Sequence, residues 1–417
     1  MKVFKFGGAS VKDAAAVRNV ATILQRYSGE KLVVVISAMG KMTNALEKLH
    51  EARFHKNETE NIFLEIKKFH QSITNDLFGA TPELPEPVQT QMDALRDAVM
   101  SSPSRNYDKE YDKIVSFGEL ISTALIHTFL VHEGLPVAWV DARQVIRTDN
   151  NFRQARIDWN RSTMGAHRIR EIFQKKDVVI IQGFIGSDAT HQSTTLGREG
   201  SDFTAAVMAF LLDAESVTIW KDVPGMLNAD PKWFENTVKL DRISFREAVE
   251  LAYYGASVIH PKTIKPLQNK NIPLFIKSFL DPEAEGSMIQ QDMDYDHLVP
   301  SFIFKPGQVL LSISTRDFSF VAEDNLREIF EILSGLGIRI NLMENSAISF
   351  SICIDKEDYK FAQLLERLQD KYEVLYNENL LLLTIRHYDE ATIKKLTEGK
   401  EVLVEERTRQ TVRMVLR

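Results

Sequence analysis

The chain has 417 residues, 44% of them hydrophobic, which is enough to form more than one buried core. Its 51 basic and 58 acidic residues are interspersed and give a net charge of −7, so we expect no nucleic-acid partner. The single cysteine, Cys353, excludes an intrachain disulfide framework, and this composition favours a cytoplasmic protein.

Residues 1–295 predict one large α/β domain. Short apolar runs such as "KVFKF", "KLVVVIS", "DVVIIQGF" and "IPLFIK" alternate with segments of helical spacing, which is typical of a mainly parallel sheet with helices on both faces. The chain opens directly on such a strand, without the pattern of a signal peptide. No apolar run approaches the roughly 18 residues that span a bilayer, so we expect no membrane partner.

The first strand leads into "KFGGAS", an unusual junction between a strand and a helix. Lys5 supplies a positive charge, while Gly7 and Gly8 allow the backbone to approach a ligand closely. Ser10 and Asp13 have the spacing of a capping box, which predicts a helix starting immediately after the glycines. Free N–H groups there would bind an anion such as a phosphate. A tight turn with an extended surface lysine explains the pattern equally well.

A second glycine-containing loop precedes a helix in "STTLGREGSDFTAAVMAFLLDA", residues 193–214. Arg198 presents a planar guanidinium suited to a carboxylate, and Asp202 could orient lysines or a metal ion. The alternative is a capped helix that carries a surface arginine.

Polar residues recur where predicted strands end, including the start of "KDVPGMLNADPK". Lys5, Ser37, Gly183 and Asp222 all lie at the carboxyl ends of predicted strands. Open α/β sheets bind ligands along that edge, so we expect these residues to share a site. The chain has neither a P-loop nor a dinucleotide-binding fingerprint to explain an anion site.

The pattern changes after residue 295. Residues 309–388 read as strand, helix, strand, strand, helix, strand, which predicts a ferredoxin-like unit within residues 296–388. A helix and two strands in residues 389–417 predict a second, shortened unit that also uses part of 300–312. Two such units in tandem indicate a regulatory region.

Six motifs in this order resemble the aspartokinase family of the amino acid kinase fold: "KFGGAS", "SAMGKMTN", "SFGELIS", "TLGREGSDFTA", "WKDVPGMLNADP" and "YGASVIHPKTI". The resemblance covers nearly the whole chain. It implies a catalytic domain over residues 1–295, followed by tandem ACT-type regulatory domains. The implied reaction transfers the γ-phosphoryl group of ATP to the β-carboxylate of L-aspartate.

The resemblance also implies roles for individual residues. Lys5, Asp202 and Lys221 are the expected catalytic residues, with Mg²⁺ held through the ATP phosphates and Asp202 as its candidate protein ligand. The aspartate site is expected to comprise Ser37, Thr43, Glu119, Arg198 and Ser201. The ATP site is expected to comprise Lys5, Gly7, Gly8, Ser10, Lys221, Asp222, Leu227, Lys232, Ser257 and Val258.

The sequence departs from the family pattern at several positions. Ala9 stands where the family usually has threonine. Ser257 replaces a lysine found in many members, and Lys221 stands where those members have threonine. We therefore hypothesise that the cation has moved from one loop to the other.

Similar ACT-type units bind lysine or threonine between paired subunits, so the resemblance implies a homodimer and an amino-acid effector. We expect Asn341, Ser346 and Ala347 in the effector pocket. Lysine-sensitive relatives tend to have acidic residues near Asn341 and Ala347, and their absence weakens the case for lysine.

Two other functions remain open. A sister kinase of the same fold could act on glutamate derivatives, carbamate or a nucleoside monophosphate, although such kinases usually lack the regulatory tail. A non-catalytic amino-acid sensor is the other possibility, and the retention of Lys5, Arg198 and Asp202 argues against it.

Overall fold

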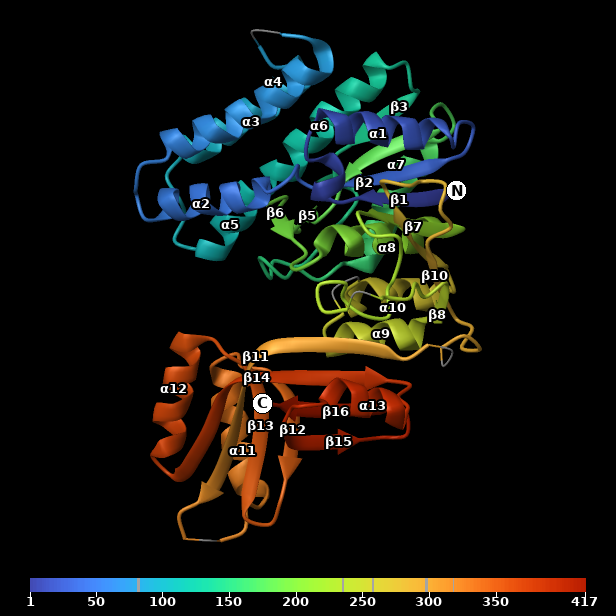
Figure 1. Cartoon of the computed structure of the whole chain (residues 1–417). Coiled ribbons are helices and arrows are strands. Elements are labelled where there is room, and N and C mark those ends of the chain that lie inside the picture. The colour runs from blue at the N-terminus through green and yellow to red at the C-terminus, as the bar shows by residue number, and fades with distance from the viewer. Residues whose placement is uncertain (81–82, 235, 257–258, 297–298, 318) are drawn as a thin grey trace. The chain divides into compact units, whose positions relative to one another are not determined.

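The computed structural model describes residues 1–80, 83–234, 236–256, 259–296, 299–317 and 319–417 (Figure 1). The chain divides into two compact units. The first consists of Met1–Met226, Lys239–Val249 and Val258–Met293, and the second of Leu227–Val238, Glu250–Ser257 and Asp294–Arg417. The second unit thus includes two segments from within residues 1–295, while the boundaries expected for functional domains stay predictions.

The first unit is built on an eight-stranded sheet in the order β3-β4-β2-β1-β7-β9-β10-β8. The neighbouring strands β3, β4, β2, β1, β7 and β9 are all parallel, and β10 runs antiparallel to β9. Every residue of β2 and β4 is buried, as expected for a sheet covered on both faces. The bounds are β1 Lys2–Phe6, β2 Leu32–Ile36, β3 Val137–Val140, β4 Val178–Gln182, β7 Ser216–Lys221, β8 Arg242–Ser244, β9 Leu274–Ser278 and β10 Ser287–Gln290.

Helices cover this sheet in two layers. From β1 through β2 to β3 the chain moves across the sheet in one direction, and right-handed crossovers place α1 and α6 on one face. From β3 through β4 and β7 to β9 it moves in the opposite direction, so the same handedness places α7, α8 and α10 on the other face. Contacts of α8 with α7 and α10, and of α3 with α1 and α6, agree with this division. The helices within residues 1–295 are α1 Ala14–Gln25, α2 Met42–Phe54, α3 Glu60–Phe78, α4 Glu86–Met100, α5 Tyr107–Val115, α6 Phe117–His132, α7 Trp159–Ile172, α8 Gly200–Leu212, α9 Phe245–Tyr254 and α10 Pro261–Lys270, and α9 has residues in both units.

The expectation that no apolar segment is long enough to cross a membrane was wrong. The helical stretch Tyr107–His132, which contains α5 and α6, is long and apolar enough by length and composition. However, 78% of its most apolar window is buried inside the protein, which is typical of a core helix.

The start of α1 also differs from the prediction. Residues Gly8–Val11 form a 3-10 turn, closed by the bond from the Ser10 N–H to the carbonyl of Gly7 at 2.9 Å. Asp13 is the N-cap of α1 and accepts from the N–H of Ala16 at 2.8 Å. The Ser10–Asp13 capping box was therefore wrong, because the Ser10 hydroxyl donates instead to the carbonyl of Trp220 at 3.2 Å.

The second unit is built on a six-stranded antiparallel sheet in the order β12-β13-β11-β14-β16-β15. Its elements are β11 Ser301–Thr315, α11 Glu323–Gly335, β12 Ile340–Asn345, β13 Ser349–Asp355, α12 Asp358–Gln369, β14 Tyr372–Arg386, α13 Glu390–Thr397, β15 Val402–Arg407 and β16 Thr411–Leu416. The expected order of helices and strands in both ferredoxin-like units is confirmed.

The two ferredoxin-like units share their central strands. Strand β11 pairs with β14 over nearly its full length, from Ser301 opposite Arg386 to Thr315 opposite Tyr372. The part of β11 from Gln308 onward also pairs with β13, whereas β16 pairs with the last residues of β14. A register shift between Lys305 and Gln308 marks the change from one unit to the other.

Candidate active site

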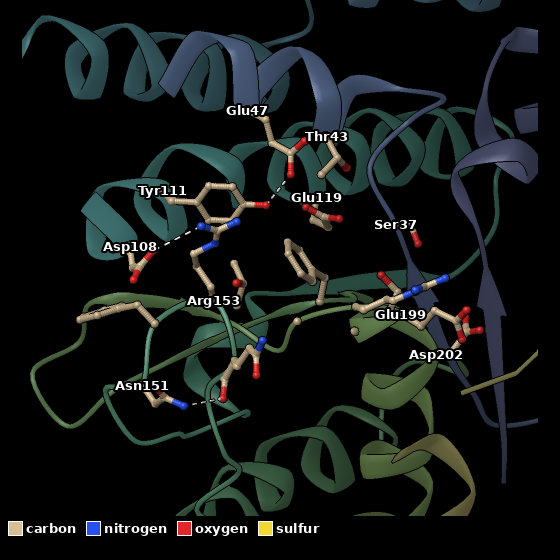
Figure 2. A pocket seen from close by; sticks show the side chains of 18 of the residues that line it. Ser37, Thr43, Glu47, Asp108, Tyr111, Glu119, Asn151, Arg153, Glu199 and Asp202 are labelled. Carbon is tan, nitrogen blue, oxygen red and sulfur yellow. Dashed lines mark hydrogen bonds and ion pairs between the residues drawn. The ribbon is translucent and has the colours of Figure 1, made fainter. Parts of the chain in front are cut away.

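A cavity of about 850 Å³ opens in the first unit, at the carboxyl ends of the central strands (Figure 2). Charged and polar side chains converge on it from several helices, including Thr43 and Glu47 of α2, Tyr111 of α5, Glu119 of α6 and Asp202 of α8. Many of the predicted site residues line this one cavity: Lys5, Ser37, Thr43, Glu119, Arg198, Ser201, Asp202 and Lys221.

Parallel strand pairing explains why these residues meet. Strands β4, β2, β1 and β7 are consecutive neighbours in the sheet. Lys5 is the second-last residue of β1, Lys221 ends β7, and Ser37 and Gly183 directly follow β2 and β4. Because parallel strands present their carboxyl ends at one edge, side chains far apart in sequence reach one space. A cavity does open along this edge and is lined by Lys5 and Ser37, whereas Gly183 and Asp222 are not among its lining residues; a ligand site there stays a prediction.

Asp202 lies between two lysines at one end of the cavity. Its Oδ1 is 2.5 Å from Lys5 Nζ, and its Oδ2 is 3.5 Å from Lys221 Nζ. Burial alone would raise the pKa of Asp202, but the charges of Lys5 and Lys221 hold that pKa below its usual value. Asp202 is therefore an anion held between two cations, and all three residues line the cavity.

Glu119 is a buried carboxylate that forms no ion pair with the residues that the structure describes. Its Oε1 accepts from the N–H of Ala38 at 3.2 Å, and its Oε2 has no hydrogen-bond partner in the described part of the chain. Burial raises the pKa of Glu119 to about 8, although the Ala38 N–H and the charge of Lys5 act in the opposite direction. This environment suits a carboxylate that receives a positively charged ligand group.

Arg198 provides the opposite charge. Arg198 lines the cavity, and none of the residues that the structure describes forms a hydrogen bond or ion pair with its guanidinium. Lys262 of α10 donates to the carbonyl of Leu196 at 2.7 Å and so supports the loop before Arg198. Sequence reasoning missed Lys262, although it lies in "VIHPKTI".

Glu199 follows Arg198 in a left-handed conformation, with φ 52°, which is unusual for a residue with a side chain. It lines the cavity, and its buried Oε2 has no hydrogen-bond partner among the described residues. Sequence reasoning treated this position only as part of the loop.

The glycines beside Lys5 permit close packing at the edge of the cavity. A Cβ on Gly8 would lie 2.8 Å from the carbonyl oxygen of Gly40 and 2.9 Å from that of Ala38. A Cβ on Gly7 would lie 3.1 Å from Lys5 Nζ. Substitution at Gly8 would therefore force two backbone segments apart.

Six other predicted nucleotide residues do not line this cavity. Gly7, Gly8, Ser10 and Asp222 flank it in sequence, whereas Leu227 and Lys232 belong to the second compact unit. Ser257 and Val258 lie outside the described residues. The nucleotide roles of all eight stay predictions.

The cavity extends beyond the predicted residues toward α2 and α5. Tyr111 donates to Glu47 Oε1 at 2.6 Å, and the Arg153 guanidinium lies 4.4 Å from the centre of the Tyr111 ring (Figure 2). Arg153 also pairs with Asp108 at 3.3 Å. Sequence reasoning missed this group because its members belong to a helical segment and a loop that carry no recognisable motif.

The predicted effector residues lie in the second unit, at opposite ends of β12. The side-chain amide of Asn341 donates to Gln308 Oε1 at 2.7 Å and accepts from Lys305 Nζ at 3.0 Å. Ser346 and Ala347 follow the strand, and the Ala347 carbonyl accepts from the N–H of Val321 at 3.0 Å. The structure thus ties Asn341 into an internal network, and the effector role of all three stays a prediction.

The described residues contain no cluster of three or more His, Cys, Asp or Glu side chains arranged to hold a metal ion. A metal in the cavity would therefore depend on ligand oxygens as well as protein carboxylates.

Comparisons with known proteins agree with this arrangement. The model of the amino acid kinase family matches residues 1–278. Lysine-sensitive aspartokinase 3 of Escherichia coli is 33% identical, with 85% of this chain and 78% of the relative covered. Chloroplastic aspartokinase 2 of Arabidopsis thaliana is 29% identical, with 88% and 69% covered.

Solved structures show the same likeness. The crystal structure of E. coli aspartokinase III in complex with aspartate and ADP matches with a TM-score of 0.81 at 28% identity. The comparison covers 100% of this chain and 96% of that one. The complex of the same enzyme with lysine and aspartate has a TM-score of 0.82, also at 28% identity, and covers 100% and 95%.

Proposed function

This chain belongs to the amino acid kinase family, and within it to the aspartokinases, and we propose that it transfers the γ-phosphoryl group of ATP to the β-carboxylate of L-aspartate. The observation that carries this proposal is the single cavity that Lys5, Asp202 and Lys221 share with Glu119 and Arg198. Lys5 and Lys221 provide positive charges that can bind a triphosphate. Glu119 and Arg198 provide a negative and a positive charge that can bind the ammonium and carboxylate groups of a free amino acid.

The chemical difficulty of this reaction is the repulsion between a carboxylate and a triphosphate. A β-carboxylate oxygen attacks the γ-phosphorus, the bond from that phosphorus to the bridging oxygen breaks, and ADP leaves behind an acyl phosphate. At an effective dielectric constant near 20, one opposite charge at about 4 Å contributes roughly 4 kcal/mol. Lys5 and Lys221, both oriented by Asp202, provide two such charges where the phosphates converge.

The acceptor is oriented by its own charged groups. The Glu119 carboxylate pairs with the α-ammonium, and the Arg198 guanidinium binds the α-carboxylate through two parallel hydrogen bonds. Ser37, Thr43 and Ser201 line the same cavity and complete the site. Fixing both charged groups on the α-carbon directs the β-carboxylate toward the phosphates, which is the positioning that phosphoryl transfer requires.

Further features of this function rest on the family and not on the geometry alone. Mg²⁺ would be held chiefly by the phosphates, because both oxygens of Asp202 already face lysines. Control by an amino acid bound at the second unit, assembly as a homodimer through that unit and a cytoplasmic location belong to the same proposal.

A coupled assay of ADP release tests the function. Aspartate should support turnover, whereas glutamate and acetylglutamate should not, and hydroxylamine should trap an acyl hydroxamate from the product. The assay repeated with lysine, threonine and methionine identifies the effector. Activity with another acceptor would point to a sister kinase, and binding of amino acids without turnover would point to a sensor.

The pH dependence of the reaction should report the ionisation of Glu119. Burial raises the pKa of Glu119 to about 8, so in the free protein this group is mostly uncharged below that pH. Because only the carboxylate pairs with an ammonium group, kcat/KM for aspartate should rise as the pH approaches about 8 from below and then level off.

The variant Glu119→Gln is the control for this measurement. It should bind aspartate weakly and lose the rise in kcat/KM, since its amide does not titrate. The same profile in both proteins would mean that another group is responsible.

A further inference from the structure

Asp112 of α5 is a buried carboxylate that the proposed mechanism does not use. Its side chain is fully buried, and no ion pair reaches it among the described residues. It accepts instead from three donors. The N–H of Arg153 lies 3.1 and 3.0 Å from its two oxygens, the N–H of Thr195 lies 2.7 Å from Oδ2, and the Thr195 hydroxyl lies 2.7 Å from Oδ1.

Burial destabilises the ionised form of the Asp112 carboxyl group. It raises the pKa of Asp112 to about 6, while the bonds from Arg153 and Thr195 oppose that rise. A buried carboxylate without a cation is costly and weakens the fold if its donors are lost. Its presence at this position therefore calls for a role beyond packing.

The segments that Asp112 joins both belong to the cavity wall. Arg153 lies in the loop of residues 151–154, which lines the cavity, and adopts a left-handed conformation with φ 64°. Thr195 ends the short strand β6, Ser193–Thr195, three residues before Arg198. A third contact closes the arrangement, because a Cβ on Gly197 would lie only 3.1 Å from the carbonyl oxygen of Arg153.

We propose that Asp112 is a positioning residue for the acceptor site: it fixes β6 against the loop of residues 151–154 and thereby places the Arg198 guanidinium. This inference rests on the proposed function, since it takes the acceptor carboxylate to be the ligand of Arg198. A displacement of about 1 Å in a substrate-binding group can reduce the rate on the order of 100-fold, so a fixed loop has a large effect.

The test compares Asp112→Asn with wild type in steady-state assays of both substrates. Asparagine keeps the size of the side chain but presents an NH₂ group to donors that need an acceptor. We expect KM for aspartate to rise about 10-fold or more while KM for ATP changes less than about twofold.

Strand β6 forms a hairpin with β5, Ile185–Ser187, and the matched control is Asp188→Asn, in the turn of that hairpin. Asp188 is also buried and accepts from the N–H groups of Thr190 at 2.8 Å and Gln192 at 2.9 Å, but it does not line the cavity. This variant should leave both KM values unchanged.

A milder variant keeps the test decisive if Asp112→Asn does not fold. Thr195→Val removes only the hydroxyl donor and should raise KM for aspartate by a smaller factor in the same direction. An unchanged KM for aspartate, or an equal rise in both KM values, overturns the inference while wild-type turnover stands. Absence of wild-type turnover with aspartate overturns the proposed function and this inference together.

Discussion

Replacement of Lys221 by alanine is expected to reduce kcat by about 10²- to 10³-fold, the effect typical of removing one group that stabilises developing charge. Lys221 Nζ lies 3.5 Å from the carboxylate of Asp202, which also binds Lys5. Loss of this cation leaves Lys5 alone to oppose the charge of the phosphates. Steady-state turnover at saturating ATP and aspartate measures the effect.

Two further variants make this prediction specific. Lys2→Ala is the control, because Lys2 lies on the same sheet, three residues before Lys5, and pairs with Glu30 outside the cavity. The double variant Lys221→Thr with Ser257→Lys restores the arrangement found in many family members. It should recover part of the turnover that Lys221→Ala loses. Normal turnover in Lys221→Ala would refute the hypothesis that this residue replaces the lysine lost at Ser257.

Replacement of Arg198 by alanine is expected to raise KM for aspartate by about 10²-fold or more, since hydrogen bonds to charged groups contribute roughly 1.5–3 kcal/mol each. Arg198 lines the cavity, and its guanidinium forms no hydrogen bond or ion pair within the described part of the chain, so its donors are available to a ligand. KM for ATP should change far less.

The variant Arg198→Lys separates charge from geometry at this position. Lysine keeps the positive charge but lacks the planar pair of donors that matches a carboxylate. Its KM for aspartate should fall between those of wild type and Arg198→Ala. An equal loss of affinity for both substrates in Arg198→Ala would indicate a damaged loop and not a lost ligand contact.

Much of the cavity could be predicted because its residues follow strands. Lys5, Ser37 and Lys221 lie at or beside the ends of apolar runs, and parallel strands bring their carboxyl ends to one edge whatever lies between them. Asp112 carried no such signal. Its donors are a backbone N–H some 40 residues away and a threonine still farther along the chain, and only the folded loops bring them together.

The same distinction explains the wrong prediction at Ser10. The spacing from Ser10 to Asp13 satisfies a local capping rule, but the Ser10 hydroxyl bonds to the carbonyl of Trp220, which is 210 residues away. A local rule cannot account for a partner brought in by the neighbouring strand β7.

The start of β11 was also predicted wrongly from the sequence. The strand was expected to begin at residue 309, with part of 300–312 assigned to the shortened unit. It begins at Ser301 and is continuous, and Pro306 and Gly307 lie at the register shift within it, where Gly307 has φ 68°.

The shared strands of the second unit limit how this protein can be recombined. Because β11 and β14 each run through both ferredoxin-like units, neither unit is a separate module that could be exchanged between relatives. A chimera joined after residue 388 would graft a foreign hairpin onto Leu381–Arg386, whose register must match β16 residue by residue. Engineering of effector specificity therefore has to replace the complete sheet or change individual side chains within it.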